Sequence, residues 1–228
     1  MADDPRLREL SSAWLERAAT HEYPYHFTWL GRPIIQYPQD LVALQEIIWK
    51  VEPDVIVETG IAHGGSLIFS ASMLELVGGD RRRVIGVDID IRAHNRVEIE
   101  GHPLFRRIEM IEGSSIDDHV VARIHGMIEP GERVLLVLDS NHTHAHVLRE
   151  LEAYSPLVQP ESYAVVFDTI IELMPPDFSR DRPWGPGNSP YTAVTQFLKT
   201  TDRFEVDETI ERKLAFTVAP GGYLRCVR

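Results

Sequence analysis

The stretch VIVETGIAHGGS, residues 55–66, decides the fold, because an apolar run ends at an acid and turns through spaced small residues into the helix-like run LIFSASMLEL. Gly60, Ala62 and Gly64 lie two residues apart in this turn, and Ser66 begins the helix-like run. Residues without a bulky Cβ let the backbone turn sharply toward a ligand, which the free N–H groups of the following helix then face. The pattern is typical of a nucleotide-type cofactor site in an α/β fold.

The acid that ends the apolar run, Glu58, selects the kind of cofactor. A dinucleotide pyrophosphate favours G-x-G-x-x-G with an acid about 20 residues downstream, whereas an acid at the strand end repels phosphate. Glu58 suits a cationic amine instead, such as the methionine part of S-adenosylmethionine. An NAD-linked enzyme is therefore the least expected alternative. A further alternative is that the turn binds no cofactor and that its glycines only allow the helix to pack tightly on the sheet.

Two further strand ends fit such a cofactor. The run at residues 84–87 ends at Asp88, where a carboxylate can accept both ribose hydroxyls. Asp90, on the following turn, could share this task, or either acid could be a solvated strand end. In IEMIEGSSID, Ser114 and Ser115 form a small polar loop that could hold the adenine edge, cap the next helix, or do both.

Composition limits the classes of function. The chain has 228 residues, of which 43% are apolar, enough for one large α/β domain with a buried core. Its net charge of −12 argues against nucleic acid or an anionic membrane as the main partner. The start MADDPRLREL lacks the order of a secretory signal, and no apolar run approaches the ~20 residues that span a bilayer. We therefore expect a cytoplasmic location. The single cysteine, Cys226, excludes an internal disulfide.

Strand-like and helix-like runs alternate from residue 54 onward, which predicts right-handed crossovers around a mainly parallel sheet. We expect strands near 54–58, 84–88, 107–111, 133–138 and 163–167, and helices near 7–19, 41–50, 66–77, 92–100, 116–126 and 144–154. The tail KLAFTVAPGGYLRCVR indicates a β-hairpin around Pro-Gly-Gly. The predicted fold is α/β, with a mostly parallel seven-stranded sheet closed by this antiparallel hairpin, as in Rossmann-like class I methyltransferases.

A second group of polar residues follows the fourth and fifth strands. In RVLLVLDSNHTHAHVLREL, a strand ends at Asp139 and is followed by His142, His144 and His146. Because parallel strands bind ligands at their carboxyl ends, Asp139 should lie beside the cofactor acids. In AVVFDTI, Asp168 follows the next strand, and the two carboxylates could share Mg²⁺.

The histidines allow two interpretations. His142 and His144, at the mouth of the site, are candidates for a general base together with Asp139, because an imidazole accepts a proton near neutral pH. His146 is expected to be an exposed or packed helix residue. Alternatively, His142, His144 and Asp168 could bind iron in a non-haem hydroxylase, since two histidines and a carboxylate form such sites.

Two irregular segments could cover the site. The first is HEYPYHFTWLGRPIIQYPQD at residues 21–40, and the second is MPPDFSRDRPWGPGNSP at residues 174–190. Long loops of this kind are often functional. We expect residues 1–40 to form an N-terminal helix and lid, and residues 41–228 to form a single cofactor-binding domain. The lid and acceptor candidates are Arg32, Gln36, Tyr37, Arg182 and Trp184.

The combined motifs resemble one family. VETGIAHGGS, VIGVDID, IEGSSID, LDSNHTHAHVL and VVFDTI, together with GRPIIQYPQD and RPWGPGN, are similar to the bacterial cephalosporin hydroxylase and rhamnosyl O-methyltransferase family over roughly residues 30–225. The resemblance implies an S-adenosylmethionine-dependent O-methyltransferase that acts on a hydroxyl of a sugar or glycosylated natural product. It also implies Mg²⁺ in some members and a homo-oligomer in most.

Carried over by motif, the resemblance implies cofactor contacts to methionine (Glu58, Gly60 and Ser66), ribose (Asp88) and adenine (Ser114 and Ser115). Asp139 and Asp168 would be metal ligands at the acceptor site. One position departs from the family, since relatives have an acidic pair after the fifth strand and Phe167 stands at the first of the two. The metal site would then be completed by water or histidine, or be absent. A non-catalytic scaffold that keeps the cofactor pocket for stability is the remaining alternative.

Overall fold

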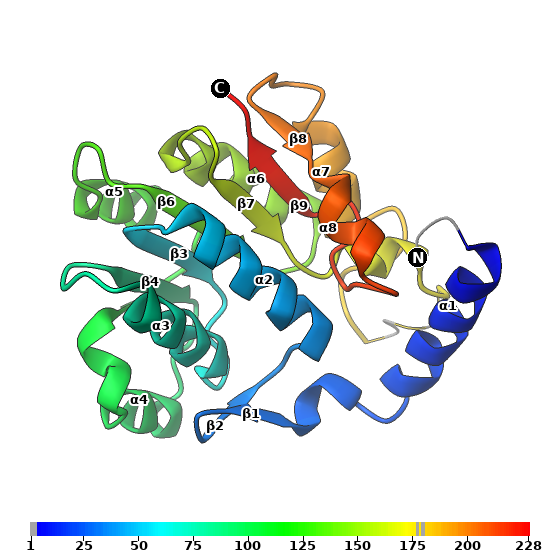
Figure 1. Cartoon of the computed structure of the whole chain (residues 1–228), viewed down its shortest axis with the longest axis horizontal. Helices are drawn as coiled ribbons and strands as arrows, with labels where there is room; N and C mark the ends of the chain where they lie inside the picture. Colours follow the sequence, from blue (N-terminus) through cyan, green and yellow to red (C-terminus); the bar gives the residue numbers. More distant parts are fainter. Residues whose placement is uncertain (1–3, 177, 179–180) are drawn as a thin grey trace.

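The computed structural model describes residues 4–176, 178 and 181–228 of the chain. In this part of the chain, helices cover both faces of a seven-stranded sheet with the order β5-β4-β3-β6-β7-β9-β8, and a separate two-stranded sheet joins β1 and β2 (Figure 1). Strands β3 to β7 are parallel to one another, whereas β9 is antiparallel to both β7 and β8. The strands are β1 (Phe27–Trp29), β2 (Arg32–Ile34), β3 (Val55–Thr59), β4 (Arg83–Asp88), β5 (Ile108–Glu112), β6 (Val134–Leu138), β7 (Tyr163–Val166), β8 (Phe204–Val206) and β9 (Tyr223–Cys226).

The described helices follow the strands in the alternation expected from the sequence. The α-helices are α1 (Pro5–Ala19), α2 (Pro38–Val51), α3 (Gly65–Val77), α4 (Ala93–Glu100), α5 (Asp118–Met127), α6 (His144–Tyr154), α7 (Pro190–Phe197) and α8 (Glu208–Lys213). The short 3₁₀ segments are η1 (Tyr23–His26), η2 (Pro103–Arg107), η3 (Ser155–Leu157) and η4 (Thr169–Leu173). The five parallel strands and the six helices predicted from the sequence are confirmed, with small differences at their ends.

The core explains why the central strands are continuous apolar runs. Every residue of β3 and of β6 is buried, because helices pack on both faces of a parallel sheet. Side chains alternate between the faces, so Ile56 joins the cluster under α2 and α3, while Val55 and Val57 join the cluster under α5 and α6. Two apolar layers therefore hold the sheet in place, and the polar residues lie at the ends of its strands.

The antiparallel strand pair at the C-terminus is confirmed, but the Pro-Gly-Gly turn does not join it. The partner of β9 is β8, and α8 lies between them. The segment before the turn leaves the sheet because it binds Asp40, a buried acid of α2. The Thr217 hydroxyl and the Val218 N–H both donate to this carboxylate, as does the Tyr223 hydroxyl at 2.7 Å. A tertiary contact with a distant helix thus overrides the local strand pattern.

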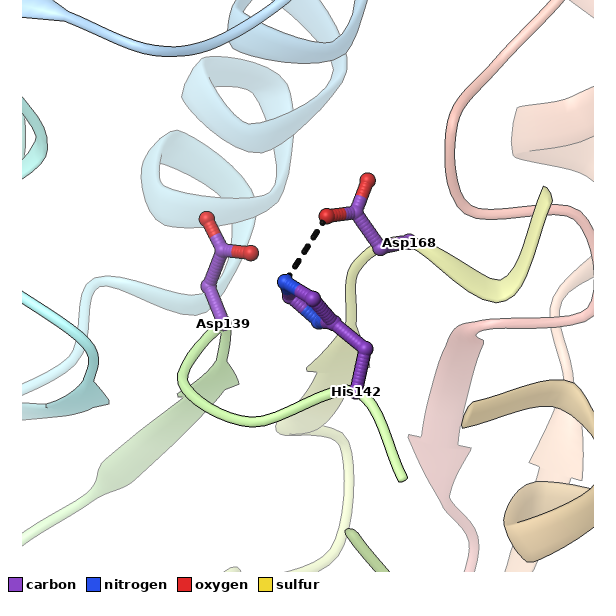
Figure 2. Close-up of side chains that lie close together, drawn as sticks. All are labelled: Asp139, His142 and Asp168. Atoms are coloured by element: carbon purple, nitrogen blue, oxygen red, sulfur yellow. Dashed lines mark ion pairs between the residues drawn. The ribbon is translucent and has the colours of Figure 1, made fainter. Parts of the chain in front are cut away.

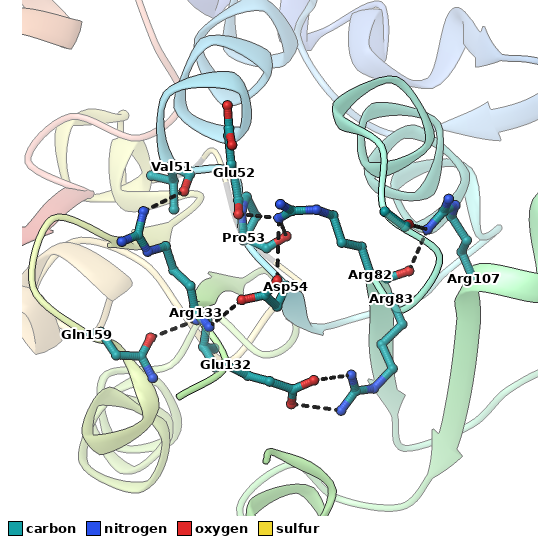
Figure 3. Close-up of polar contacts among 12 residues, drawn as sticks. Val51, Glu52, Pro53, Asp54, Arg82, Arg83, Arg107, Glu132, Arg133 and Gln159 are labelled. Atoms are coloured by element: carbon teal, nitrogen blue, oxygen red, sulfur yellow. Dashed lines mark hydrogen bonds and ion pairs between the residues drawn. The ribbon is translucent and has the colours of Figure 1, made fainter. Parts of the chain in front are cut away.

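Arginine side chains stabilise the edge of the sheet where the parallel strands begin (Figure 3). Arg107 donates to the carbonyls of Gly79 and Arg82, each at 2.9 Å, and Arg133 donates to the Val51 carbonyl at 3.0 Å. Backbone acceptors left by helix and loop ends are thereby satisfied. The polar groups that remain without such partners lie at the opposite edge, where the strands end.

Candidate active site

The turn after β3 approaches the backbone after β6 so closely that it requires glycine. Gly60 has a φ of +91°, and a Cβ at this position would lie 2.1 Å from the carbonyl oxygen of Asp139. Ala62 also adopts a positive φ, of 46°. Both residues line two adjoining cavities. Gly64 lines neither cavity, and a Cβ there would meet the side chain of Ile99, so this glycine is required for the packing of the turn against α4.

Glu58 ends β3 as a buried carboxylate with a spare oxygen. It is 1% exposed, and Ser70 donates to its Oε2 at 3.3 Å. Its Oε1 has no hydrogen-bond partner among the residues that the structure describes. Burial raises the pKa of Glu58 to about 7, although the hydroxyls of Ser66 and Ser70 oppose the shift. Because Ser66 lines the first cavity, a cationic group bound there would stabilise the ionised form of Glu58.

The two cavities have volumes of about 510 and 470 Å³ and share Gly60, Ala62 and Asp139 in their walls. The second cavity is also lined by Asp88, Ser114 and Ser115. These residues come from the ends of β3, β4, β5 and β6, as the sequence predicts for an open parallel sheet. The residues assigned to ribose and adenine therefore surround one cavity.

Asp88 has a second task in the structure. Its Oδ2 accepts hydrogen bonds from the N–H groups of Ile61 at 2.7 Å and Ala62 at 3.2 Å, and its Oδ1 accepts one from the N–H of Asp90 at 3.1 Å. Asp88 therefore holds the turn after β3 in place while it lines the cavity. The Asp90 side chain is exposed and does not line either cavity, so the expectation that it shares the ribose is not supported.

Ser115 does not cap a helix. The helix α5 begins at Asp118 after the N-cap Asp117, so the capping alternative is wrong for both serines. Instead, the buried Ser115 hydroxyl donates to Glu150 of α6 at 2.5 Å. Ser114 remains beside the cavity without that contact.

Asp139, His142 and Asp168 converge where β6 and β7 end, and Figure 2 shows the three side chains pointing toward one another. One ligand atom from each lies within 4.8 Å of the others, and His142 Nε2 is 3.2 Å from Asp168 Oδ2. Burial, followed by the charges of Asp168 and Glu58, raises the pKa of Asp139 well above its usual value. Gln36 donates to Asp139 Oδ2 at 2.9 Å. Two carboxylates and an imidazole at this spacing suit a divalent cation.

The backbone at Asp168 supports a functional role for this group. Asp168 has a φ of +57°, in the left-handed region that non-glycine residues rarely adopt. Such conformations persist where surrounding structure imposes them, and they are frequent at ligand sites. Phe167, where the family resemblance implies an acid, is 2% exposed and belongs to the apolar core. It therefore contributes no ligand to the cluster.

His144 does not face the site, which corrects its assignment as a candidate base. Its Nδ1 lies 2.8 Å from Thr192 Oγ1, and its Nε2 lies 3.1 Å from Gln196 Oε1. Both partners belong to α7, so the imidazole joins α6 to α7. The iron site of His142, His144 and Asp168 is thus not assembled, and the hydroxylase alternative loses its ligand set.

Four of the five lid candidates line the first cavity: Gln36, Tyr37, Arg182 and Trp184. The Trp184 ring packs edge-on against His142, with centroids 4.8 Å apart, and the Arg182 guanidinium lies 5.3 Å from the Trp184 centroid. Arg32 is instead structural, since it donates to the His63 carbonyl at 2.6 Å. Residues 177, 179 and 180 of the second irregular segment lie outside the described residues.

The position of His146 in the site was not predicted from the sequence. His146 was expected to be packed or exposed, but it lines the second cavity. Its Nε2 lies 3.3 Å from Glu150 Oε1, one helical turn along α6. The i, i+4 spacing of a histidine and an acid near the start of a helix was the available signal.

The sheet order, the acids at its carboxyl edge and the small-residue turn define a Rossmann-like protein of the methyltransferase class. The chain belongs to the Rhamnosyl O-methyltransferase/CmcI family, whose model matches residues 21–227. A rhamnosyl O-methyltransferase of Mycobacterium bovis is 30% identical over 203 residues, which cover 86% of this chain and 77% of that protein.

Solved structures agree with this fold. A CmcI structure with Mg and SAM has a TM-score of 0.62 and 21% identity, covering 90% of this chain and 78% of that chain. The MycE methyltransferase of the mycinamycin biosynthetic pathway, in complex with Mg, SAH and mycinamycin VI, has a TM-score of 0.54 and 20% identity, covering 99% of this chain and 56% of that chain. The fold, the family and the enzyme class predicted from the sequence, an O-methyltransferase, are thereby confirmed.

None of the helices in the described part of the chain combines the length and the apolar character that a membrane crossing requires.

Proposed function

We propose that this protein transfers the methyl group of S-adenosylmethionine to a hydroxyl of a sugar or glycosylated natural product, with Mg²⁺ at the acceptor. One observation carries the proposal: Ser66, which hydrogen-bonds to buried Glu58, and the Asp139–His142–Asp168 cluster line the same cavity. The names of relatives support it, since they include rhamnosyl O-methyltransferases and structures with Mg and SAM.

The donor residues follow from the walls of the cavities. S-Adenosylmethionine, when bound, supplies its methyl group as an electrophilic carbon on a sulfonium sulfur. Glu58 provides the unpartnered carboxylate oxygen for the cationic methionine part, next to Ser66. Asp88 accepts the ribose hydroxyls, and Ser114 lies beside the adenine in the second cavity. Binding of the cation offsets the cost of keeping Glu58 ionised in a buried place.

The acceptor residues act by positioning and by proton removal. Tyr37, Trp184 and Phe178 are among the apolar walls of the first cavity, where they can hold an acceptor and exclude water. A Mg²⁺ ion bound by Asp168 and His142 would lower the pKa of the acceptor hydroxyl. Asp139 takes the hydroxyl proton, because Gln36 occupies only its Oδ2 and leaves Oδ1 for the acceptor hydroxyl.

Three alanine variants test this assignment. Asp139→Ala and His142→Ala should remove turnover with a sugar-bearing acceptor, while calorimetric titration shows almost unchanged affinity for S-adenosylhomocysteine. His144→Ala is the matched control, because His144 binds α7 and should keep turnover. Full activity in both Asp139→Ala and His142→Ala would refute the base and metal assignment.

Metal removal tests the cation separately. We expect EDTA to abolish turnover of the wild type and excess Mg²⁺ to restore it, since two carboxylates and a histidine lie together at the acceptor side. Calorimetric titration with S-adenosylhomocysteine should give the same affinity before and after EDTA treatment. Undiminished turnover in EDTA would remove Mg²⁺ from the proposal and leave Asp139 to act alone.

We also propose that the N-terminal segment of the chain acts as a lid. Residues 1–40 act as a lid over a single cofactor-binding domain of residues 41–228; Leu15 of α1 and Tyr37 are among the walls of the first cavity. A homo-oligomer and a cytoplasmic location remain predictions, from family resemblance and from composition and sequence pattern respectively. Size-exclusion chromatography with light scattering measures the first directly.

A further inference from the structure

Glu150 is a fully buried carboxylate that the proposed reaction does not use. It lies on α6 with 0% exposure, and its Oε1 accepts hydrogen bonds from the hydroxyls of Ser115 at 2.5 Å and Ser140 at 2.7 Å. Its Oε2 has no hydrogen-bond partner among the described residues. A buried acid is costly, so its retention calls for a role in positioning other groups.

The groups around Glu150 fix the tautomer of His146. His146 Nε2 faces three oxygens: Ser115 Oγ at 3.0 Å, Ser140 Oγ at 3.3 Å and Glu150 Oε1 at 3.3 Å. Each serine has one hydroxyl hydrogen, and both are donated to Glu150. None of the three oxygens can then donate to Nε2, so Nε2 must carry the hydrogen. In a neutral imidazole, Nδ1 is left as a hydrogen-bond acceptor.

This acceptor belongs to a side chain in the wall of the second cavity. His146 is 16% exposed there and shares the cavity with Asp88 and Ser114. Its Nδ1 makes no hydrogen bond with another described residue. Ser115 and Ser140, which hold the Nε2 side of the ring, line the same cavity. The network therefore fixes Nδ1 as an acceptor on a side chain that lines this cavity.

We infer that His146 is a specificity residue for the nucleobase of the cofactor, whose Nδ1 accepts a hydrogen bond from the exocyclic amino group of adenine. Glu150 is the positioning residue that holds the imidazole in the required tautomer. The inference rests on the proposed function, because it assumes an adenosyl ligand in the second cavity. A base with a carbonyl in place of the amino group would put two acceptors opposite each other and be rejected.

The experiment measures discrimination between two ligands by calorimetric titration. The probes are S-adenosylhomocysteine and S-inosylhomocysteine, in which a carbonyl replaces the amino group at position 6. The wild type should bind the inosyl compound roughly ten- to a hundredfold more weakly, as for a polar group left without its partner. In His146→Ala, the ratio of the two dissociation constants should fall to within about threefold of unity, because the acceptor that rejects the carbonyl is gone.

Two further variants separate positioning from folding. Glu150→Gln keeps the side-chain shape but can donate to His146, so the preference for the adenosyl compound should also fall severalfold. His119→Ala removes an exposed imidazole of α5 that lies outside both cavities, and its ratio should equal that of the wild type. His146→Phe preserves a ring in the cavity wall and repeats the measurement if His146→Ala fails to fold, as checked by circular dichroism.

The outcomes separate the inference from the proposed function. If the wild type binds neither compound, the proposed function fails and the inference fails with it. If the wild type binds both compounds equally well, or if His146→Ala and His146→Phe keep the wild-type ratio, the inference is overturned while the proposed function stands. Loss of discrimination in the His146 variants, with His119→Ala unchanged, supports it.

Discussion

Replacing Glu58 with glutamine removes a charge from the protein interior while keeping the shape of the side chain. Burial raises the pKa of this carboxyl from 4.5 to about 7 in the folded protein. The ionised form is therefore disfavoured by folding, and Glu58 lowers the stability of the ligand-free protein at neutral and alkaline pH. Ser66, whose hydroxyl hydrogen-bonds to Glu58, lines the first cavity, and the cationic group proposed to bind there would offset this cost.

The magnitude and sign follow from the shift. Because the folded pKa is raised, the stability contribution of Glu58 is fully present below pH 4.5 and is lost as the pH rises through about 7. At about 1.4 kcal/mol per pKa unit, the difference between 4.5 and 7 amounts to about 3 kcal/mol. Glu58→Gln should thus be more stable than the wild type by about 3 kcal/mol at pH 8, and by about 1 kcal/mol or less at pH 5.

Urea unfolding at both pH values, followed by circular dichroism, measures the free energy of unfolding of each protein. Glu75→Gln is the control of opposite sign, since hydrogen bonds from Arg107 and Arg106 lower the pKa of Glu75. It should destabilise the protein at pH 8 and have less effect as the pH falls toward and below the ordinary pKa of the carboxyl. An equal stability of Glu58→Gln and wild type at pH 8 would refute the burial argument.

The same variant tests the proposed ligand contact. A hydrogen bond to a charged group is worth about 1.5–3 kcal/mol, so Glu58→Gln should bind S-adenosylhomocysteine more weakly by roughly tenfold or more. A variant that gains stability at pH 8 and binds with wild-type affinity would show that Glu58 is a buried acid without a role in donor binding.

Four more substitutions have definite expectations. Gly60→Ala should lower the free energy of unfolding by about 2 kcal/mol or more, because the new Cβ would lie 2.1 Å from the Asp139 carbonyl. Gly126→Ala in α5, with open space around it, should instead raise the free energy of unfolding by about 0.5–1 kcal/mol. Equal melting temperatures of the two variants would contradict both expectations. Arg107→Ala should cost about 2 kcal/mol in urea unfolding, since two part-buried hydrogen bonds from a charged group to backbone carbonyls are lost, and a loss below about 0.5 kcal/mol would count against it. Trp184→Ala should raise the KM for the acceptor more than the dissociation constant of S-adenosylhomocysteine, because Trp184 packs on His142; the reverse order would place Trp184 on the donor side.

The sheet and its carboxyl edge could be predicted because they depend on local patterns. Short, mostly apolar runs mark the parallel strands, and an acid at the end of such a run must lie at the carboxyl ends that these strands share. Glu58, Asp88 and Asp139 are correctly placed for this reason. The position of each acid can be predicted from the end of its strand alone, without the structure of the loops.

The predictions that were wrong concern residues held by contacts between distant segments. The strand expected before Pro-Gly-Gly is absent because Thr217 binds Asp40, which lies 177 residues away in the sequence. His144 turns from the site because α7 offers Thr192 and Gln196 to its ring. Helical pitch alone indicates which residues share a face, but it does not show which neighbouring element that face meets.

Phe167 explains why the segment after β7 contributes only one acid to the proposed metal site. The Phe167 side chain packs into the apolar core at 2% exposure, where a carboxylate would remain unpaired and be strongly disfavoured. Asp168, in contrast, is turned outward by its left-handed backbone and meets His142 Nε2 at 3.2 Å. A cluster of two carboxylates and one imidazole carries one negative charge fewer than three carboxylates would, and it favours a softer divalent cation. Mn²⁺ or Co²⁺ should therefore support turnover at lower concentrations than Mg²⁺, and a strict requirement for Mg²⁺ would show that His142 is not a ligand.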